Sequence, residues 1–279
     1  MRMITLLLSL LLPLTPISVV HAEEILRLAT TTSTDNSGLI KYLFPEFEKQ
    51  SGYKVHVIAV GTGKALRMGR DGDVDVLLVH APKAENTFVD EGYGVKRIPV
   101  MYNDFVLVGP KNDPAKIAGA ATLPTALKKI ADSKQAFISR GDDSGTHKKE
   151  LSLWTAADVK PGGKWYREAG QGMGKVLQIA GEMDAYTITD RGTWLAFQEK
   201  SPLTIVFEGD KQLFNPYSII AINPEKHADL NHKGSAALIN WITSKETQKR
   251  IGAFKLHGQQ LFTPNSTATK TSTMLEKLN

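Results

Sequence analysis

Short apolar segments alternate with amphipathic ones along the first part of this chain, and this alternation limits the fold more than any other feature. Apolar runs that favour β-strands occupy residues 24–30, 53–60 and 74–82. After the first run, Leu39, Leu43 and Phe47 recur at helical spacing in a segment that stops at Gly52. A second helix is expected over residues 64–72. This order predicts an α/β fold with a largely parallel sheet, helices on both faces, and ligands bound where strands end and helices begin.

The pattern starts afresh after an apolar strand at residues 101–110. Helices are expected at residues 122–134, 147–157, 173–183 and 191–198, and strands at 135–140, 185–190, 203–209 and 217–224. One long final helix is expected over residues 235–254. Two lobes with the chain crossing between them fit this order. We expect the first lobe to contain residues 23–103 and 213–279, and the second lobe to contain residues 104–212.

Residues 1–22 have the pattern of a cleavable signal peptide. Arg2 precedes an apolar run, and the segment ends in Val20, His21 and Ala22, as a signal peptidase site requires. A membrane anchor is the rival interpretation, but prolines interrupt a run that is shorter than the roughly 20 apolar residues of a spanning helix. We therefore expect export. The chain contains no cysteine, which excludes disulfides, thiolate metal sites and thiol nucleophiles, so its own core must stabilise it.

The charge of the chain is mildly positive and is spread along the sequence. The 34 Lys and Arg residues outnumber the 29 Asp and Glu residues, and the excess of five falls to four once a leader with Arg2 is removed. Nucleic-acid binding is not indicated, because that function is typical of clustered basic residues. A small anionic ligand suits this balance better.

Two loops with many hydroxyl groups each follow an apolar strand and precede a helix. The first is TTTSTDNSG at residues 30–38, and the second is SRGDDSGT at residues 139–146. Unpaired N–H groups and the helix dipole make helix starts attractive to anions, and Ser and Thr add donors without charge. Helix capping explains one or two such residues. Two rich loops, one in each lobe and one with Arg140, favour a cleft for a deprotonated oxyanion.

Enzyme motifs fit the chain poorly. The sequence GDDSGT resembles the GDSGG of serine proteases, but Asp143 breaks the spacing. A phosphate-binding P-loop would need glycine at Ile58 and a hydroxyl at Ala65. The histidines lack metal-ligand spacing. A secreted hydrolase that acts on an anionic ester is kept as the alternative from another class of protein.

Several motifs together resemble the tungstate-binding periplasmic proteins of tungstate ABC importers. They are ATTTSTDNSGL, AVGTGKAL, DVLLVHAP, MYNDFVLVGP, SRGDDSGTHKKELSLW, GQGMG, YTITDRGTW and LFNPYSIIAINP, in that order. The resemblance implies a two-lobed type II periplasmic binding protein fold with tungstate in the interlobe cleft, and molybdate as a further candidate ligand. It also implies a monomer in the periplasm that delivers its ligand to a membrane permease driven by an ATPase. No catalytic residue, cofactor or metal site is implied, because tungsten is bound only as the oxyanion.

The resemblance also assigns site residues. The TTTS signature of the family implies binding by Thr31, Thr32 and Ser33, and its second-lobe loop implies binding by Arg140, Ser144, Gly145 and Thr146. A wider set comprises Thr62 in a glycine-rich turn at residues 61–63, and Thr30, Ser139, Tyr186 and Thr187. Replacing Arg140 by Ala should cost about 1.5–3 kcal/mol of binding free energy, as for a hydrogen bond to a charged group.

Phosphate- or sulfate-binding proteins of the same fold are the nearest alternatives. Phosphate-binding proteins have an aspartate that accepts the ligand proton where this chain has His80, although Asp35, Asp142 or Asp143 could replace it. The histidine favours a proton-free dianion. Binding should then depend little on pH between about 6 and 8 unless His80 or His147 titrates.

Overall fold

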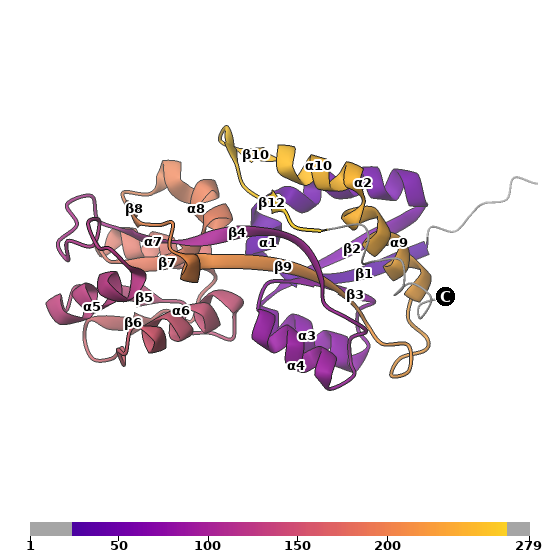
Figure 1. Ribbon diagram of the computed structural model, residues 1–279, viewed down its shortest axis with the longest axis horizontal. Coiled ribbons are helices and arrows are strands. Elements are labelled where there is room, and N and C mark those ends of the chain that lie inside the picture. The colour runs from indigo at the N-terminus through magenta and orange to yellow at the C-terminus, as the bar shows by residue number, and fades with distance from the viewer. Residues whose placement is uncertain (1–23, 267–279) are drawn as a thin grey trace, which may run out of the picture.

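Two lobes connected by two long strands make up the protein, as the computed structural model shows (Figure 1). It describes residues 24–266. The first lobe contains β1 (Glu24–Thr31), α1 (Thr32–Asn36), α2 (Leu39–Ser51), β2 (Tyr53–Val60), α3 (Thr62–Asp71), β3 (Val76–Val79) and α4 (Pro82–Asp90). The second lobe contains α5 (Leu123–Ser133), β5 (Phe137–Ser139), α6 (Gly145–Ala156), β6 (Tyr166–Glu168), α7 (Met173–Glu182), β7 (Thr187–Asp190), α8 (Arg191–Phe197) and β8 (Thr204–Phe207), with the 3-10 helices η1 (Gln198–Lys200) and η2 (Lys211–Leu213).

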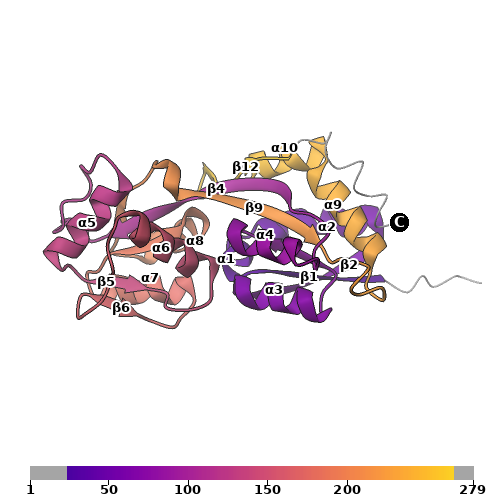
Figure 2. The ribbon, with the colours of Figure 1, turned by 60° about the horizontal axis from the view of Figure 1, so that its bottom comes forward.

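The connecting strands are β4 (Ile98–Gly109) and β9 (Phe214–Ala221), which lie side by side from the middle of the molecule into the first lobe (Figures 1 and 2). In the second lobe the end of β4 pairs with β7 and β8. After β9 the chain ends with α9 (His232–Thr243), α10 (Lys245–Ala253), β10 (Lys255–Leu256), β11 (Gln259–Gln260) and β12 (Thr263–Pro264). The predicted lobe boundaries, at 103/104 and 212/213, fall inside β4 and inside η2.

The main sheet is mixed, so the prediction of a largely parallel sheet is wrong. Its strand order is β12-β4-β9-β3-β1-β2, and β7 and β8 also pair with β4. In a separate two-stranded sheet, β5 is parallel to β6. In the main sheet, β1 is parallel to β2 and β3. The remaining pairs of this sheet are antiparallel, because the chain leaves the first lobe along β4 and returns along β9 in the opposite direction.

Most predicted elements form as their apolar pattern indicates. All of β3 is buried, and α2 buries Leu39, Leu43 and Phe47. Gly52 ends α2 as its C-cap with φ 78°, a backbone conformation that glycine adopts without a steric penalty.

Two segments expected to be irregular contain helix starts. Residues 32–36 form the short helix α1, with Thr31 as its N-cap. The expected turn at 61–63 is the beginning of α3, because Gly61 is the N-cap and Thr62 the first helical residue. A single-residue boundary is easily misread from sequence, since cap and turn residues are the same types.

The long final helix predicted from residue 235 to 254 is two helices. Ser244 has extended backbone angles, and its side chain accepts a hydrogen bond from Thr247 N, which starts α10. The cap interrupts the helix although the apolar pattern continues.

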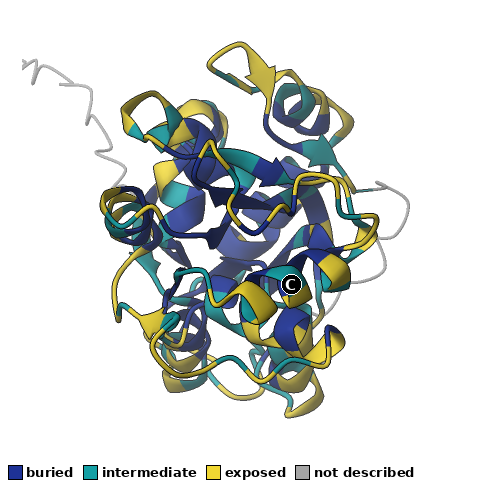
Figure 3. Cartoon of the chain, turned by 90° about the vertical axis from the view of Figure 1, so that its left-hand side faces the viewer, coloured by how far each residue is buried: buried dark blue, intermediate teal, exposed yellow. Residues whose placement is uncertain are grey.

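Hydrophobic cores fill both lobes. The cluster around Phe137, Trp154 and Tyr186 lies in the second lobe, and the cluster around Leu77, Phe88 and Ile220 lies in the first. A third cluster draws residues from both lobes and includes Val106 and Val108 of β4. Buried residues accordingly follow the central strands, and exposed residues face outward on helices and loops (Figure 3).

The predicted leader lies outside the described residues. Within residues 24–266, no helix combines the length and apolar character needed to cross a bilayer.

Candidate functional site

The two loops singled out in the sequence lie at the contact between the lobes. Gly63 N at the start of α3 donates a hydrogen bond to Asp143 O before α6, at 3.3 Å. A Cβ atom placed on Gly145 would lie 2.9 Å from Thr62 Oγ1. In addition, α1 packs against α8. Helices from both lobes therefore begin at one place, at the waist of the molecule (Figure 2).

The first loop holds a cluster of buried hydroxyl groups. Thr31 Oγ1 accepts a hydrogen bond from Thr34 N at 3.3 Å, and it lies 2.6 Å from Thr34 Oγ1 and 3.1 Å from Ser33 Oγ. Thr32 is half-buried in the first turn of α1. Thr31 thus caps the helix and also belongs to a hydroxyl network, which combines the two interpretations weighed from the sequence.

His80 follows β3 and contacts this hydroxyl cluster. Its Nε2 lies 3.1 Å from Thr31 Oγ1 and 3.3 Å from Ser33 Oγ, and its Nδ1 lies 2.9 Å from Asn215 Oδ1. Burial lowers the pKa of His80, and the positive charge of Arg140 acts in the same direction, whereas Asp190 and the bond to Asn215 oppose it. The imidazole is therefore neutral near pH 7.

Thr62 has a fully buried hydroxyl with no hydrogen-bond partner among the described residues. A Cβ at Gly145 would meet both this oxygen and His80 Cε1, at 2.9 and 3.5 Å, so the three residues are neighbours. A buried hydroxyl without a partner costs about 1–3 kcal/mol. At the start of a helix, an unpaired buried hydroxyl such as that of Thr62 is suited to donate a hydrogen bond to a ligand.

The second loop supplies a buried cation. Arg140 is only 5% exposed, and its Nε and Nη2 donate to Asp142 Oδ2 at 3.1 and 2.6 Å. Asp142 Oδ1 accepts from Ser144 N at 3.2 Å, so the same carboxylate also shapes the start of α6. Ser144 and Thr146 are buried there. The guanidinium is thus fixed by Asp142 beside a helix start that favours anions.

Asp143 connects the lobes. Its carboxylate pairs with Lys148 of α6 at 2.6 Å and with Arg67 of α3 at 3.2 Å. Partial burial acts to raise the pKa of Asp143, but these two cations outweigh it and lower the value. A Cβ on Gly63 would lie 1.6 Å from Asp143 Oδ2, so the side chain occupies the space above the glycine. The structure is therefore that of closed lobes.

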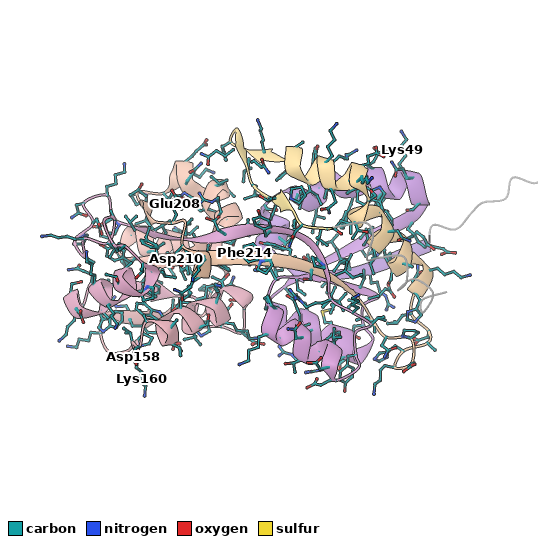
Figure 4. All side chains as sticks on the ribbon, viewed as in Figure 1. Lys49, Asp158, Lys160, Glu208, Asp210 and Phe214 are labelled. Atoms are coloured by element: carbon teal, nitrogen blue, oxygen red, sulfur yellow. The ribbon has the colours of Figure 1, made fainter. Side chains whose placement is uncertain are left out.

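A further contact across the waist comes from α6. Lys149 Nζ donates to the carbonyl of Phe214 at 3.4 Å, and burial lowers the pKa of this lysine. Phe214 itself begins β9 and lies midway along the molecule (Figure 4).

Four residues of the wider predicted set use their hydroxyl groups inside the fold. Thr30 donates to Leu78 O, Thr187 donates to Ile138 O, Ser139 donates to Glu150, and Tyr186 donates to Asp113. Tyr186 is fully buried in the core of the second lobe, and its oxygen also accepts from Ala115 N. These side chains support the site's surroundings, and their hydrogens are already committed.

Two of the acidic residues weighed as proton acceptors are engaged, since Asp142 and Asp143 pair with cations. Asp35 is half-buried in the first turn of α1. His147 lies 4.0 Å from the buried Glu150, and hydrogen bonding to this carboxylate, helped by its charge and opposed by burial, raises the pKa of the histidine.

Sequence reasoning missed two residues near the site. Asp190 caps α8 through Thr193 N at 2.9 Å and also accepts from Thr193 Oγ1 at 2.7 Å. Its signal was present, since Asp at a junction of strand and helix repeats the pattern of the two recognised loops. Asn215 holds His80, and only tertiary structure brings these residues together, 135 positions apart.

Within residues 24–266, no group of three or more His, Asp or Glu side chains is arranged to hold a metal ion. The donors gathered at the waist are hydroxyl, guanidinium and backbone N–H groups, which suit an anion.

Comparisons with known proteins agree with this geometry. Residues 20–246 match a PBP superfamily domain. The chain is 52% identical over 252 residues to the tungstate-binding protein TupA of Peptoclostridium acidaminophilum, and the match covers 88% of this chain and 87% of that protein.

Two solved structures are also similar to the chain. The structure of the tungstate-binding protein TupA from Desulfovibrio alaskensis G20 is similar with a TM-score of 0.77 and 48% sequence identity. The match covers 88% of this chain and 100% of the TupA chain. The structure of the tungstate ABC transporter from Geobacter sulfurreducens has a TM-score of 0.78 and 56% identity, with 84% and 100% covered. The two-lobed α/β fold predicted from the sequence is thereby confirmed.

Proposed function

The chain belongs to the PBP superfamily and, within it, to the family of tungstate-binding proteins, and on that premise we propose that it captures tungstate between its lobes as the solute-binding component of an ABC importer. A membrane permease and its ATPase are the partners that receive the ligand.

The observation that carries this proposal is the position of Thr62. Its buried hydroxyl lacks a partner among the described residues and lies between the start of α3 and the start of α6. Arg140, almost fully buried at the end of β5, supplies positive charge on the opposite lobe. An oxyanion would accept hydrogen bonds from both sides at once, and closing the lobes would exclude water and strengthen those bonds.

We assign binding to Thr31, Ser33 and Thr62 in the first lobe and to Arg140, Ser144 and Thr146 in the second. Thr32 and Gly145 contribute through their backbone N–H groups at the first turns of α1 and α6. The lobes themselves are proposed to divide at residues 103/104 and 212/213, as expected from the sequence.

Phosphate and sulfate remain the alternative ligands. Hydrogen phosphate needs a proton acceptor, and the neutral His80 already contacts two hydroxyl groups through Nε2. Asp190 is buried nearby, but both of its carboxylate oxygens accept from Thr193. This arrangement supports a fully deprotonated ligand, and sulfate differs from tungstate there only in size.

We further propose that the protein is exported as a monomer, that residues 1–22 are removed, and that it acts in the periplasm without catalysis. The leader pattern supports export. The names of the similar proteins support a binding role rather than an enzymatic one.

Isothermal titration of the ligand-stripped protein, residues 23–279, with tungstate, molybdate, sulfate and phosphate tests the proposal. Tight 1:1 binding of tungstate, with weak sulfate and phosphate binding, is expected. Preference for phosphate or sulfate would overturn the ligand, and no binding of any oxyanion would mean that the loops only cap helices. Turnover of 4-nitrophenyl phosphate in a parallel assay would favour the hydrolase alternative.

A further inference from the structure

His80 lies between the hydroxyl cluster of the first loop and a pair of amide side chains, those of Asn215 and Asn103. Building on the proposed function, we propose that His80 is a positioning residue that takes up a proton from solvent when the oxyanion binds. Each captured tungstate then brings about one proton into the closed site, and the protein binds its dianion more tightly at lower pH.

This pair of amide side chains determines which ring nitrogen of His80 carries hydrogen in the ligand-free protein. Asn215 Nδ2 donates to Asn103 Oδ1 at 2.7 Å and lies 3.2 Å from the Tyr217 hydroxyl. This orientation turns Asn215 Oδ1 toward His80, where it accepts from Nδ1 at 2.9 Å. Because the ring is neutral, Nε2 has a lone pair and no hydrogen.

The lone pair on Nε2 affects the hydroxyl groups of the first loop. Thr31 Oγ1 and Ser33 Oγ lie 3.1 and 3.3 Å from it, and a hydroxyl has one hydrogen to donate. A hydroxyl that donates to Nε2 presents only lone pairs to a ligand. A deprotonated oxyanion can only accept hydrogen bonds, so it would be repelled by that arrangement.

Protonation of Nε2 reverses the direction of this hydrogen bond. The imidazolium donates through Nδ1 to Asn215 and through Nε2 to Thr31 or Ser33, and the hydroxyl hydrogen is released for the oxyanion. No bond other than those to the transferred proton is made or broken, and the buffer is the proton source. His80 therefore orients the hydroxyl donors without itself touching the ligand.

The charges around the imidazole ring determine the pH at which His80 becomes protonated. Asp190 of β7 favours the imidazolium, and Arg140 at the end of β5 disfavours it. Tyr217 of β9 stacks on the ring with 4.6 Å between centroids, and Phe105 of β4 lies at 6.5 Å, so aromatic faces cover it. Burial keeps His80 neutral without ligand, and a bound dianion adds negative charge that raises its pKa. Proton uptake on binding is the consequence.

Calorimetry measures this uptake directly. Tungstate is titrated into the wild-type protein at several pH values between 6 and 9, each in two buffers of different ionisation enthalpy. The enthalpy difference between the buffers is expected to correspond to about one proton in the pH range between the two pKa values of His80. Affinity should fall roughly tenfold per pH unit there. Tungstate binding without any buffer dependence at every pH would overturn the proposal.

Variants assign the proton to His80. We expect H80Q to bind tungstate with no proton uptake, whereas the matched exposed control H56Q behaves like the wild type. Loss of uptake in H147Q but not in H80Q would overturn the assignment. If H80Q does not fold, N215D provides the second test, since a carboxylate at Nδ1 protonates His80 beforehand and should abolish uptake near pH 7. A wild-type protein that binds no oxyanion would instead refute the proposed function.

Discussion

The two loops that meet at the waist are built from different chemistry. The first-lobe loop presents neutral hydroxyl groups, with Thr31 and Ser33 in contact with each other and with His80, which follows β3. The second-lobe loop adds charges to its hydroxyl groups, with Arg140 held by Asp142 and with Asp143 bound to cations of both lobes. This difference indicates a division of roles. In the proposed function, the neutral donors would give an oxyanion directed hydrogen bonds, and the charged loop would attract it and hold the lobes together.

Removing the buried cation should have the largest effect. Arg140→Ala should weaken tungstate binding by about 1.5–3 kcal/mol, or roughly 10- to 150-fold, because a charge-assisted hydrogen bond is lost. Isothermal titration measures the change. Arg140→Lys keeps the charge without the planar fork and should fall between the two, and unchanged affinity in the alanine variant would remove Arg140 from the site.

Removing one neutral donor from the first lobe should cost less. Thr62→Val should lower tungstate affinity by about 1.5 kcal/mol, the low end of the range for a hydrogen bond to a charged group, because the donor that is lost carries no charge itself. It should not lower the free energy of unfolding, because Thr62 Oγ1 has no partner within the described part of the fold.

Thr187→Val is the matched control for this change. Its hydroxyl donates to Ile138 O inside the second lobe, so the substitution should destabilise the protein and leave affinity nearly unchanged. Thermal melts and titrations of the two variants should therefore give opposite patterns. The same pattern in both would contradict the role of Thr62.

The contact between the loops should contribute less again. Asp143→Asn weakens the ion pairs with Arg67 and Lys148, which are well exposed, so affinity should fall by at most about 1 kcal/mol. The loss should shrink at high salt, because screening already weakens exposed pairs. Asp158→Asn, at an exposed site elsewhere in the second lobe (Figure 4), should have no effect on binding. A loss that does not depend on salt would argue against an ion pair as the cause.

The smallest expected effect is on the stability of the fold, through the pair of His147 and Glu150 in α6. Glu150 raises the pKa of His147, so this pair stabilises the fold below the unfolded value of about 6.5 and loses its contribution as pH rises through the folded pKa. The free energies of unfolding of wild type and His147→Gln, measured by denaturant titration, should differ by no more than about 1 kcal/mol at pH 6 and converge by pH 9. A difference that grows with pH would contradict this sign.

The sequence was sufficient for most local elements around both loops. Helical spacing located α2, apolar runs located β1 to β3, and the strand, hydroxyl loop and helix order located the start of α6 to within two residues. These features depend on neighbours in the chain, which a sequence displays directly. The short helix α1, in contrast, lies inside the segment expected to be a loop. The resemblance to a known family then placed the ligand between the lobes.

Relations between distant segments could not be predicted in the same way. The antiparallel pairing of β4 with β9 depends on the path of the chain between lobes, and the contact of His80 with Asn215 depends on the pairing of β3 with β9. The break at Ser244 was hidden because its cap lies within a continuous apolar pattern. The strand pairing and the contact of His80 arise from tertiary contacts, whereas the break at Ser244 arises from a local helix cap that the apolar pattern does not display.

The lobes can close in the observed way only because residue 63 is a glycine and has no side chain. The carboxylate of Asp143 fills the place where a Cβ would stand, so even alanine there would force Asp143 to rotate away from Arg67 and Lys148. Each lobe would keep its own fold, because the conflict arises only when the lobes meet. The glycine at position 63 therefore shifts the equilibrium between open and closed protein toward the closed form. The same equilibrium would set how long a captured ion stays enclosed.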